Sequence, residues 1–309
     1  MSIEKVKTIF SSLSTCPAWS IELLQIKNSK RNGVSYAGCE VTFSPEGTLT
    51  AFVREISNRY ISEKKGVLNS YHGIIEYDGS TVEHIIYKLD HSNPLISKEY
   101  ELLLAAIAEP DVETDPLEFK ARAYVLRGTI IIAEEEKPVK LISMQNPVTS
   151  LKHKFLRSAG TFSEITDKVI TLRTSIDVVI LDGVVYMLTL AGENLFNMER
   201  AYKAVCAEKL NIIEDYGIVT DFDEFSAYAS SGHNPRKFVS FNEEHLKKLK
   251  NTASRRRIAK KFNIPMEGDK FNTSDSDAAD KLVKLLCDRG MVDPFDDNPM
   301  EVAGSKKWE

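Results

Sequence analysis

The sequence predicts an α+β protein, with a mainly antiparallel sheet and hairpins in the N-terminal two-thirds and a helical C-terminal region. Two dipeptides, Asp78-Gly79 and Asp182-Gly183, lie between runs rich in β-branched residues, a pattern typical of hairpins. After residue 232, apolar residues recur instead at helical spacing. The chain is 42% hydrophobic and 28% charged, a balance that excludes a disordered or fibrous protein.

The N-terminal part is expected to mix helices and strands. It opens with an amphipathic helix, because Ile3, Val6, Phe10 and Leu13 are three or four residues apart. The elements expected next are strands over 34–43 and 49–61 around a turn at 44–47, a hairpin joining 70–77 to 81–88, and an apolar helix over 97–108.

The central part is expected to continue the sheet, with strands over 120–133, 139–144, 169–172, 176–181 and 184–190. Asp and Gly both tolerate the positive φ of a type I′ turn, so Asp182-Gly183 should close an antiparallel hairpin. Its Val179, Leu181, Val185 and Met187 side chains should be largely buried. The next elements are expected to be a helix capped by Asn194 and an acidic linker over 214–232.

The C-terminal part reads as a set of helices. Asn242 is a suitable N-cap, and a break is expected near Asn251-Thr252. A last helix should begin near Ser274 and end with Gly290 as its C-cap glycine. Its buried face should comprise Ala279, Leu282, Val283 and Leu286.

The chain length suits more than one domain. We expect three regions: an α+β subdomain over 1–110, an antiparallel sheet with a packed helix over 111–232, and a basic helical region over 233–309. The four cysteines lack metal-ligand or redox spacing, which predicts buried, reduced thiols. No signal peptide or membrane-spanning run is evident, so we expect a cytoplasmic protein.

Positive charge is concentrated in one segment. The chain has a formal net charge of −5, whereas residues 231–263 contain ten Lys or Arg and only two acids. Such a block is typical of proteins that contact the DNA backbone, although a solvated helix face would look the same. The candidate DNA-binding residues are Arg236, Lys237, Lys247, Lys248, Arg255, Arg256, Arg257, Lys260 and Lys261, together with a smaller basic spot at Lys152, Lys154 and Arg157.

Motifs for catalysis are weak. The six histidines show no metal-ligand pattern, and no phosphate-binding glycine loop is present. Asp115, Glu118 and Lys120 loosely resemble the acids and lysine of metal-dependent nucleases, which hold a divalent ion and a water molecule. A nuclease is therefore the alternative to a binding protein. We expect no catalytic residue, no metal and no cofactor.

One stretch resembles a known family. Residues 176–187 form a strand, an Asp-Gly turn and a strand with Tyr186, and a helix with Phe196 follows. This arrangement, the stretch 282–292 and the run 304–307 are similar to the KwaB-like family. The family tends to have Phe-Glu where this chain has Phe196-Asn197.

The resemblance implies the cytoplasmic component of the Kiwa anti-phage defence system. It implies a dimer-forming module that binds phage DNA and blocks phage replication and late expression. The basic block itself predicts contacts to phosphates, and hence DNA binding that does not depend on sequence. The expected partners of the protein are DNA, a second copy of itself, and the multi-pass membrane protein KwaA, which would recruit it to the inner membrane face. No catalytic residue carries over from the family.

Overall fold

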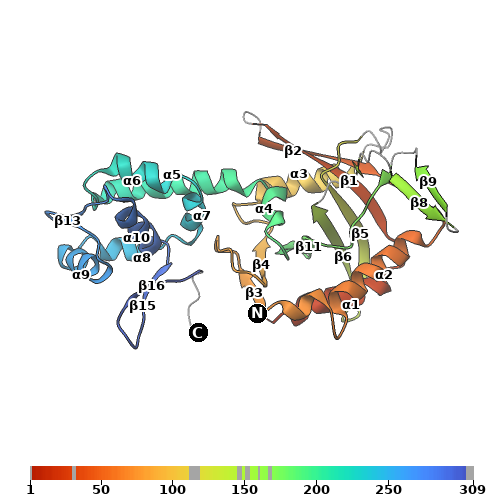
Figure 1. Ribbon diagram of the computed structural model, residues 1–309, viewed down its shortest axis with the longest axis horizontal. Helices are drawn as coiled ribbons and strands as arrows, with labels where there is room; N and C mark the ends of the chain where they lie inside the picture. Colours follow the sequence, from red (N-terminus) through yellow and green to blue (C-terminus); the bar gives the residue numbers. More distant parts are fainter. Residues whose placement is uncertain are drawn as a thin grey trace. The chain divides into compact units, whose positions relative to one another are not determined.

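The computed structural model describes residues 2–29, 33–110, 119–144, 148–149, 154–158, 161–165 and 169–303 (Figure 1). The chain forms two compact units. The first unit comprises Met1–Glu76 and His84–Asn197, and the second comprises Tyr77–Glu83 and Met198–Glu309. The short loop over 77–83 therefore belongs to the second unit, although its flanking strands belong to the first. The division into three regions remains a prediction.

An eight-stranded sheet forms the centre of the first unit, in the order β2-β1-β5-β6-β11-β12-β4-β3. All neighbouring strands are antiparallel except β3 and β4, so the α+β class is confirmed. The strands are β1 (Ser20–Ser29), β2 (Gly33–Glu40), β3 (Gly73–Glu76), β4 (Ile85–Asp90), β5 (Ala123–Ile132), β6 (Glu135–Met144), β11 (Val178–Leu181) and β12 (Val184–Met187).

Helices cover both faces of this sheet. The helices α1 (Glu4–Ser12) and α2 (Thr48–Ile61) pack on the face that carries Leu23 and Leu141, and together they form the main core. The helices α3 (Ser97–Ala108) and α4 (Ala191–Leu195) lie on the opposite face, where Gly38 leaves room for the α3 backbone. The helices predicted at the N-terminus and over 97–108 are thereby confirmed.

The second predicted hairpin is also confirmed. Strands β11 and β12 pair antiparallel, with Leu181 opposite Val184. Asp182 and Gly183 both have positive φ, at 52° and 74°. The four side chains predicted to be buried are at most 3% exposed.

The prediction for Asp78-Gly79 is wrong. Strands β3 and β4 run parallel, so the chain must cross over between them, and no tight turn can join them. Instead, the intervening loop packs within the second unit. There the Asp78 carbonyl accepts a hydrogen bond from Arg289 at 3.1 Å, and the Ser80 carbonyl accepts one from Arg236 at 3.0 Å.

The segment over 49–61 is helical, not extended as predicted. Its buried residues Val53, Ile56 and Tyr60 are spaced three and four apart, which places them on one face of α2. Tyr60 stacks on Phe10 of α1, with ring centroids 4.2 Å apart. The helical spacing of the apolar residues therefore decides the secondary structure of this segment, and its β-branched composition does not.

The second unit is mainly helical. Its helices are α5 (Met198–Tyr216), α6 (Phe222–Ala229), α7 (Asn234–Lys237), α8 (Glu243–Lys248), α9 (Thr252–Phe262) and α10 (Ser276–Leu286). This unit also contains the helical turn η3 (Phe238–Ser240) and the strands β13 (Met266–Glu267), β14 (Lys270–Phe271), β15 (Gly290–Val292) and β16 (Pro299–Glu301). The remaining short elements belong to the first unit and are the helical turns η1 (Leu13–Thr15) and η2 (Val67–Ser70) and the strands β7 (Val148–Thr149), β8 (Lys154–Ser158), β9 (Thr161–Ile165) and β10 (Val169–Ile170).

Four local predictions over residues 191–290 need correction. The expected linker over 214–232 contains α6, whose N-cap Asp221 accepts a hydrogen bond from the Glu224 backbone at 3.0 Å. Asn194 lies inside α4 and caps no helix. The last helix begins at Ser276 with Asp275 as its N-cap, and Gly290 opens β15. The predicted apolar face of α10 is buried, as are all four cysteines, none of which forms a disulfide.

Candidate nucleic-acid interface

Two asparagines define the helices that carry most of the basic block. The Asn242 side chain accepts from the backbone of Glu244 and so starts α8. The Asn251 side chain accepts from the backbone of Ala253, at 2.8 Å, and starts α9. The Asn242 cap was predicted, because a side-chain oxygen can satisfy the unpaired N–H groups of a first helical turn. At Asn251 only a break in the helical pattern was predicted, and the structure shows that this residue caps the next helix. The basic side chains of 247–261 therefore project from two short, capped helices.

Arg236 and Lys237 of α7 have structural roles. Arg236 donates to the Tyr77 hydroxyl at 3.1 Å and to the Ser80 carbonyl, so it holds the loop over 77–83. Lys237 pairs with Asp280 at 2.9 Å. These contacts account for both side chains within the unit.

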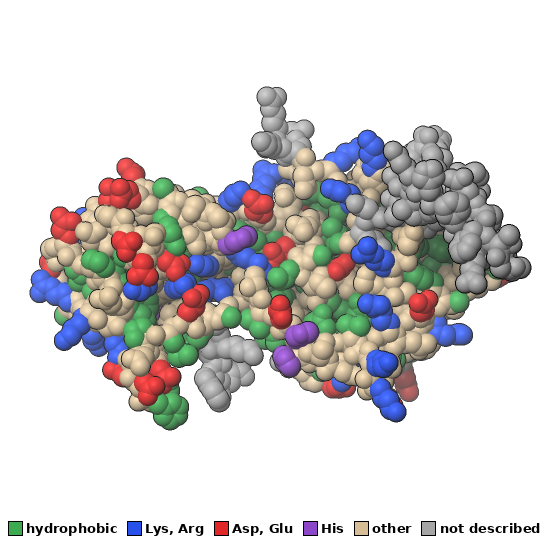
Figure 2. Space-filling view, in the orientation of Figure 1, with side chains coloured by type: hydrophobic (Ala, Val, Ile, Leu, Met, Phe, Trp, Pro, Cys, Tyr) green, Lys and Arg blue, Asp and Glu red, His purple; other side chains and the backbone are tan. Residues whose placement is uncertain are grey.

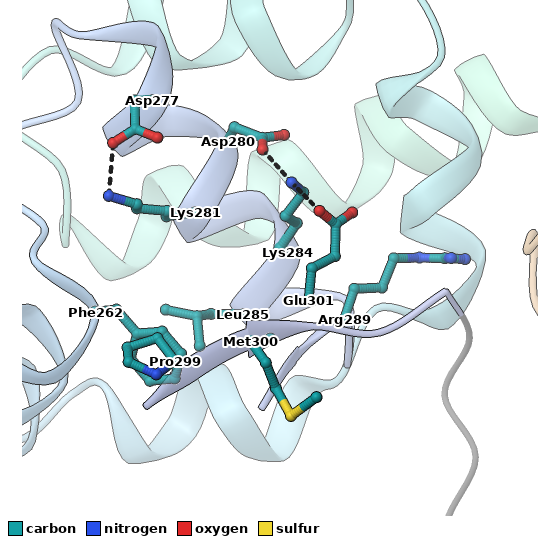
Figure 3. Close-up of a pocket in the computed structure, with 11 residues that line it drawn as sticks. Phe262, Asp277, Asp280, Lys281, Lys284, Leu285, Arg289, Pro299, Met300 and Glu301 are labelled. Atoms are coloured by element: carbon teal, nitrogen blue, oxygen red, sulfur yellow. Dashed lines mark hydrogen bonds and ion pairs between the residues drawn. The ribbon is translucent and has the colours of Figure 1, made fainter. Parts of the chain in front are cut away.

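Asp280 is shared between two lysines of the second unit. Burial opposes its ionisation, but hydrogen bonds from Lys284 and Lys237 outweigh burial and lower the pKa of Asp280. Lys284 also pairs with Glu301 at 2.6 Å, and Lys281 pairs with Asp277 at 2.6 Å (Figure 3). Charge is therefore balanced around the pocket of about 190 Å³ that these residues line.

Arg255 is anchored as well, which corrects the expectation that the three arginines 255–257 are all solvated. Its guanidinium donates to the carbonyls of Leu249 and Asp269, each at 2.6 Å, and to the Thr252 hydroxyl at 3.0 Å. The Leu249 carbonyl lies at the C-terminal end of α8, where a positive charge is favourable. Arg255 thus locks α8 to α9.

Three cations of the block are exposed or half-exposed and paired with an acid. Lys247 pairs with Glu244 at 2.6 Å and Arg256 pairs with Asp269 at 2.7 Å. Lys261 pairs with Asp297. Exposed ion pairs of this kind contribute little to stability, about 0 to 1 kcal/mol, so they can be exchanged for another partner.

Three further cations, Lys248, Arg257 and Lys260, are exposed and have no ion pair or hydrogen bond within the described part of the chain. The tenth cation of the block, Lys250, lies over the Tyr216 ring, with its Nζ atom 4.6 Å from the ring centroid. Figure 2 shows Lys and Arg side chains gathered over α9. Because these three exposed cations make no contact of this kind within the fold, they can bind an external anion without breaking one. They form the part of the predicted basic block that is best placed to bind a ligand.

The smaller basic spot is only partly described. Lys152 lies outside the described residues, and Lys154 and Arg157 belong to strand β8. Of the three residues considered for a nuclease, Asp115 and Glu118 also lie outside the described residues, while Lys120 is exposed. Among described residues, no group of three or more His, Cys, Asp or Glu side chains is placed to hold a metal ion.

The family model described as "Kiwa protein KwaB-like" matches residues 129–292, more than half of the chain. The chain belongs to the KwaB-like family. It is thus a component of the Kiwa anti-phage system. The region that matches the family model runs from β5 to β15 and includes α8 and α9. No curated protein and no solved structure matches the chain.

The described helices include none that is both long enough and apolar enough to cross a membrane. Sequence reasoning missed two acids, Asp269 and Asp297, that neutralise cations of this KwaB-like surface. Neither acid is within one helical turn of the lysine or arginine that it pairs with. Only the fold brings them together, so no local spacing could have identified them.

Proposed function

We propose that this KwaB-like protein is a non-catalytic effector that binds DNA without sequence preference and so blocks phage replication and expression. The observation that carries the proposal is the exposed charge of residues 243–262. Six Lys or Arg side chains are exposed there, against two exposed acids. Each cation that neutralises a backbone phosphate releases condensed counterions, which supplies affinity independent of sequence.

Aromatic residues of the basic block support phosphate contact over base contact. Phe238 is 1% exposed, and Phe241 and Phe262 pack against the core of the second unit. Packed in this way, they offer little ring surface for the stacking that single-strand binders use. What remains for a nucleic acid is a surface of positive charge.

Partners follow from the family membership. We propose that the protein is recruited by the membrane protein KwaA and forms a homodimer or higher oligomer, since a closed two-fold dimer is the commonest soluble assembly. Co-purification with KwaA from membranes and light scattering of the isolated protein test these two proposals. A constant mass of 34.8 kDa at all concentrations would contradict self-association.

The DNA-binding proposal is tested by fluorescence anisotropy of a short labelled duplex at several salt concentrations. The variant Lys248→Glu/Arg257→Glu/Lys260→Glu reverses the three unpaired cations and should weaken binding at least about tenfold. The log–log salt slope should become shallower by about 0.9 for each phosphate that the variant no longer neutralises. A matched control, Lys27→Glu/Lys64→Glu/Lys65→Glu, makes the same charge change at exposed lysines of the first unit.

Equal weakening in both variants would show that only net charge matters and would refute a local surface. Incubation of the wild-type protein with DNA and magnesium distinguishes DNA binding from the alternative function, a metal-dependent nuclease. Intact, retarded DNA is expected, whereas fragments would indicate the nuclease.

A further inference from the structure

An open hollow of about 740 Å³ lies in the second unit, between α9 and the β15–β16 hairpin. Arg257, Lys260 and Lys261 line it from α9, and their spacing of three and four residues places them on one helix face. Phe262 contributes an apolar wall, and Asp297 approaches from the hairpin loop. The hollow is therefore lined by three cations and a single acid.

The charge balance separates this hollow from its neighbour on α10. In the α10 pocket, each lysine has an acidic partner, and Lys284 has two. In the α9 hollow, Asp297 pairs with Lys261, which leaves Arg257 and Lys260 without an ion pair among the described residues. An anion entering the α9 hollow would meet two unpaired cations, and a third if Asp297 withdrew.

Hydrogen bonds within the loop fix the backbone position of Asp297. The Asp297 backbone donates to the Asp293 carbonyl at 2.9 Å, and the Asp293 side chain accepts from the backbone of Phe295 at 2.7 Å. Asp297 has a φ of 58°, a conformation that Asp and Asn adopt more readily than other side chains. Its carboxylate is 83% exposed, so only Lys261 and solvent stabilise its charge.

A carboxylate in this position imitates a phosphate. It is an anion with oxygen acceptors, held against a lysine that faces two further cations. Because the Lys261–Asp297 pair is exposed, breaking it costs little. A DNA phosphate at the same place would feel repulsion from Asp297 as well as attraction from the three cations.

We propose that the α9 hollow is the seat of a backbone phosphate of DNA, and that Asp297 is an internal competitor that occupies Lys261 until DNA displaces it. This inference rests on the proposed function. It assigns the phosphate contact to Arg257, Lys260 and Lys261. It also means that Asp297 of the hairpin loop lowers the affinity for DNA.

The test measures duplex binding by anisotropy for the wild type and for Asp297→Asn, which removes the charge and keeps the backbone preference. Asp297→Asn should tighten binding about three- to tenfold, the effect of removing one repulsive charge a few ångströms from a phosphate when both groups are exposed to water, where the dielectric constant is about 80. The salt slope should steepen by about 0.9, because one more cation becomes available. The matched control is Glu199→Gln, which removes an exposed acid paired with Lys203 at 2.5 Å on α5.

A second pair of variants localises the effect. In an Arg257→Ala/Lys260→Ala background, Asp297→Asn should tighten binding less than twofold, because the seat is removed. An unchanged affinity of Asp297→Asn, an equal gain in Glu199→Gln, or a full gain in the double-alanine background would each overturn the inference while leaving DNA binding intact. Absence of wild-type binding at low salt would instead overturn the proposed function and this inference with it.

Discussion

Each of the two compact units contains an Asp-Gly dipeptide, and the two dipeptides have different roles. In the first unit, Asp182 and Gly183 both have positive φ and close a hairpin. In the second unit, Gly79 has a φ of 75°, but its loop packs against α7 and leads to a parallel strand. The glycine conformation is local and common to both turns, whereas strand pairing depends on where the flanking chain packs.

The largest expected effect tests the difference between these two turns. Gly79→Ala would place a Cβ atom 2.3 Å from the Arg236 carbonyl oxygen, and this backbone cannot move away cheaply. We expect a loss of about 3 kcal/mol or more in the free energy of unfolding. At Gly183, the nearest atoms belong to the exposed side chain of His91, which can rotate. Gly183→Ala should therefore cost only about 1 kcal/mol.

Urea denaturation followed by circular dichroism measures both variants. Hydrogen exchange then identifies the unit affected, and Gly79→Ala should lower protection in α7 and α10. Equal losses for the two variants would contradict the distinction between the turns.

The second prediction concerns a polar contact that holds the core of the first unit. The Tyr60 hydroxyl, on a side chain 3% exposed, accepts from the Ile176 backbone N–H at 2.6 Å and donates to the Ile176 carbonyl at 2.8 Å. Burial is the main reason that the pKa of Tyr60 is raised. Tyr60→Phe leaves two buried backbone groups without a partner and should cost about 2 kcal/mol. A thermal melt unchanged from the wild type would refute this role.

The third prediction sharpens the contrast between anchored and unpaired cations in the second unit. Arg255→Ala removes charge-assisted hydrogen bonds to the carbonyls of Leu249, Lys250 and Asp269 and should cost about 1 to 2 kcal/mol in unfolding experiments. Arg257→Ala should change stability by less than about 0.5 kcal/mol but lower DNA affinity. The reverse pattern would mean that the roles of the two arginines are exchanged.

The smallest expected effect is on pH dependence in the first unit. Burial raises the pKa of Glu22, although its hydrogen bonds with Arg127 oppose the shift. The folded state then binds a proton more tightly than the unfolded state, so stability falls as pH rises from the usual pKa of 4.5 through the raised value. Glu22→Gln should flatten this part of the stability curve, as measured by urea denaturation between pH 4 and about 7. A curve that keeps the wild-type slope would contradict the prediction.

The sequence by itself determined the features that depend on neighbouring residues. These include the terminal helix, the hairpin at Asp182-Gly183, the Asn242 cap, the break near Asn251-Thr252 and the apolar face of α10. In each case a backbone preference and a hydrophobic period agree, so local energetics suffice. The concentration of positive charge at 231–263 was equally visible in the sequence.

Only the tertiary structure decided which of these basic residues are anchored within the fold and which are exposed to solvent. Arg255 and Arg257 are two positions apart and identical in chemistry, yet one meets helix-terminal carbonyls and the other meets solvent. Tertiary structure also decided that the loop over 77–83 leaves the sheet and that Asp297 meets Lys261. The physical reason is that ion pairs and backbone contacts between distant segments depend on how the elements pack, and no local propensity encodes that packing.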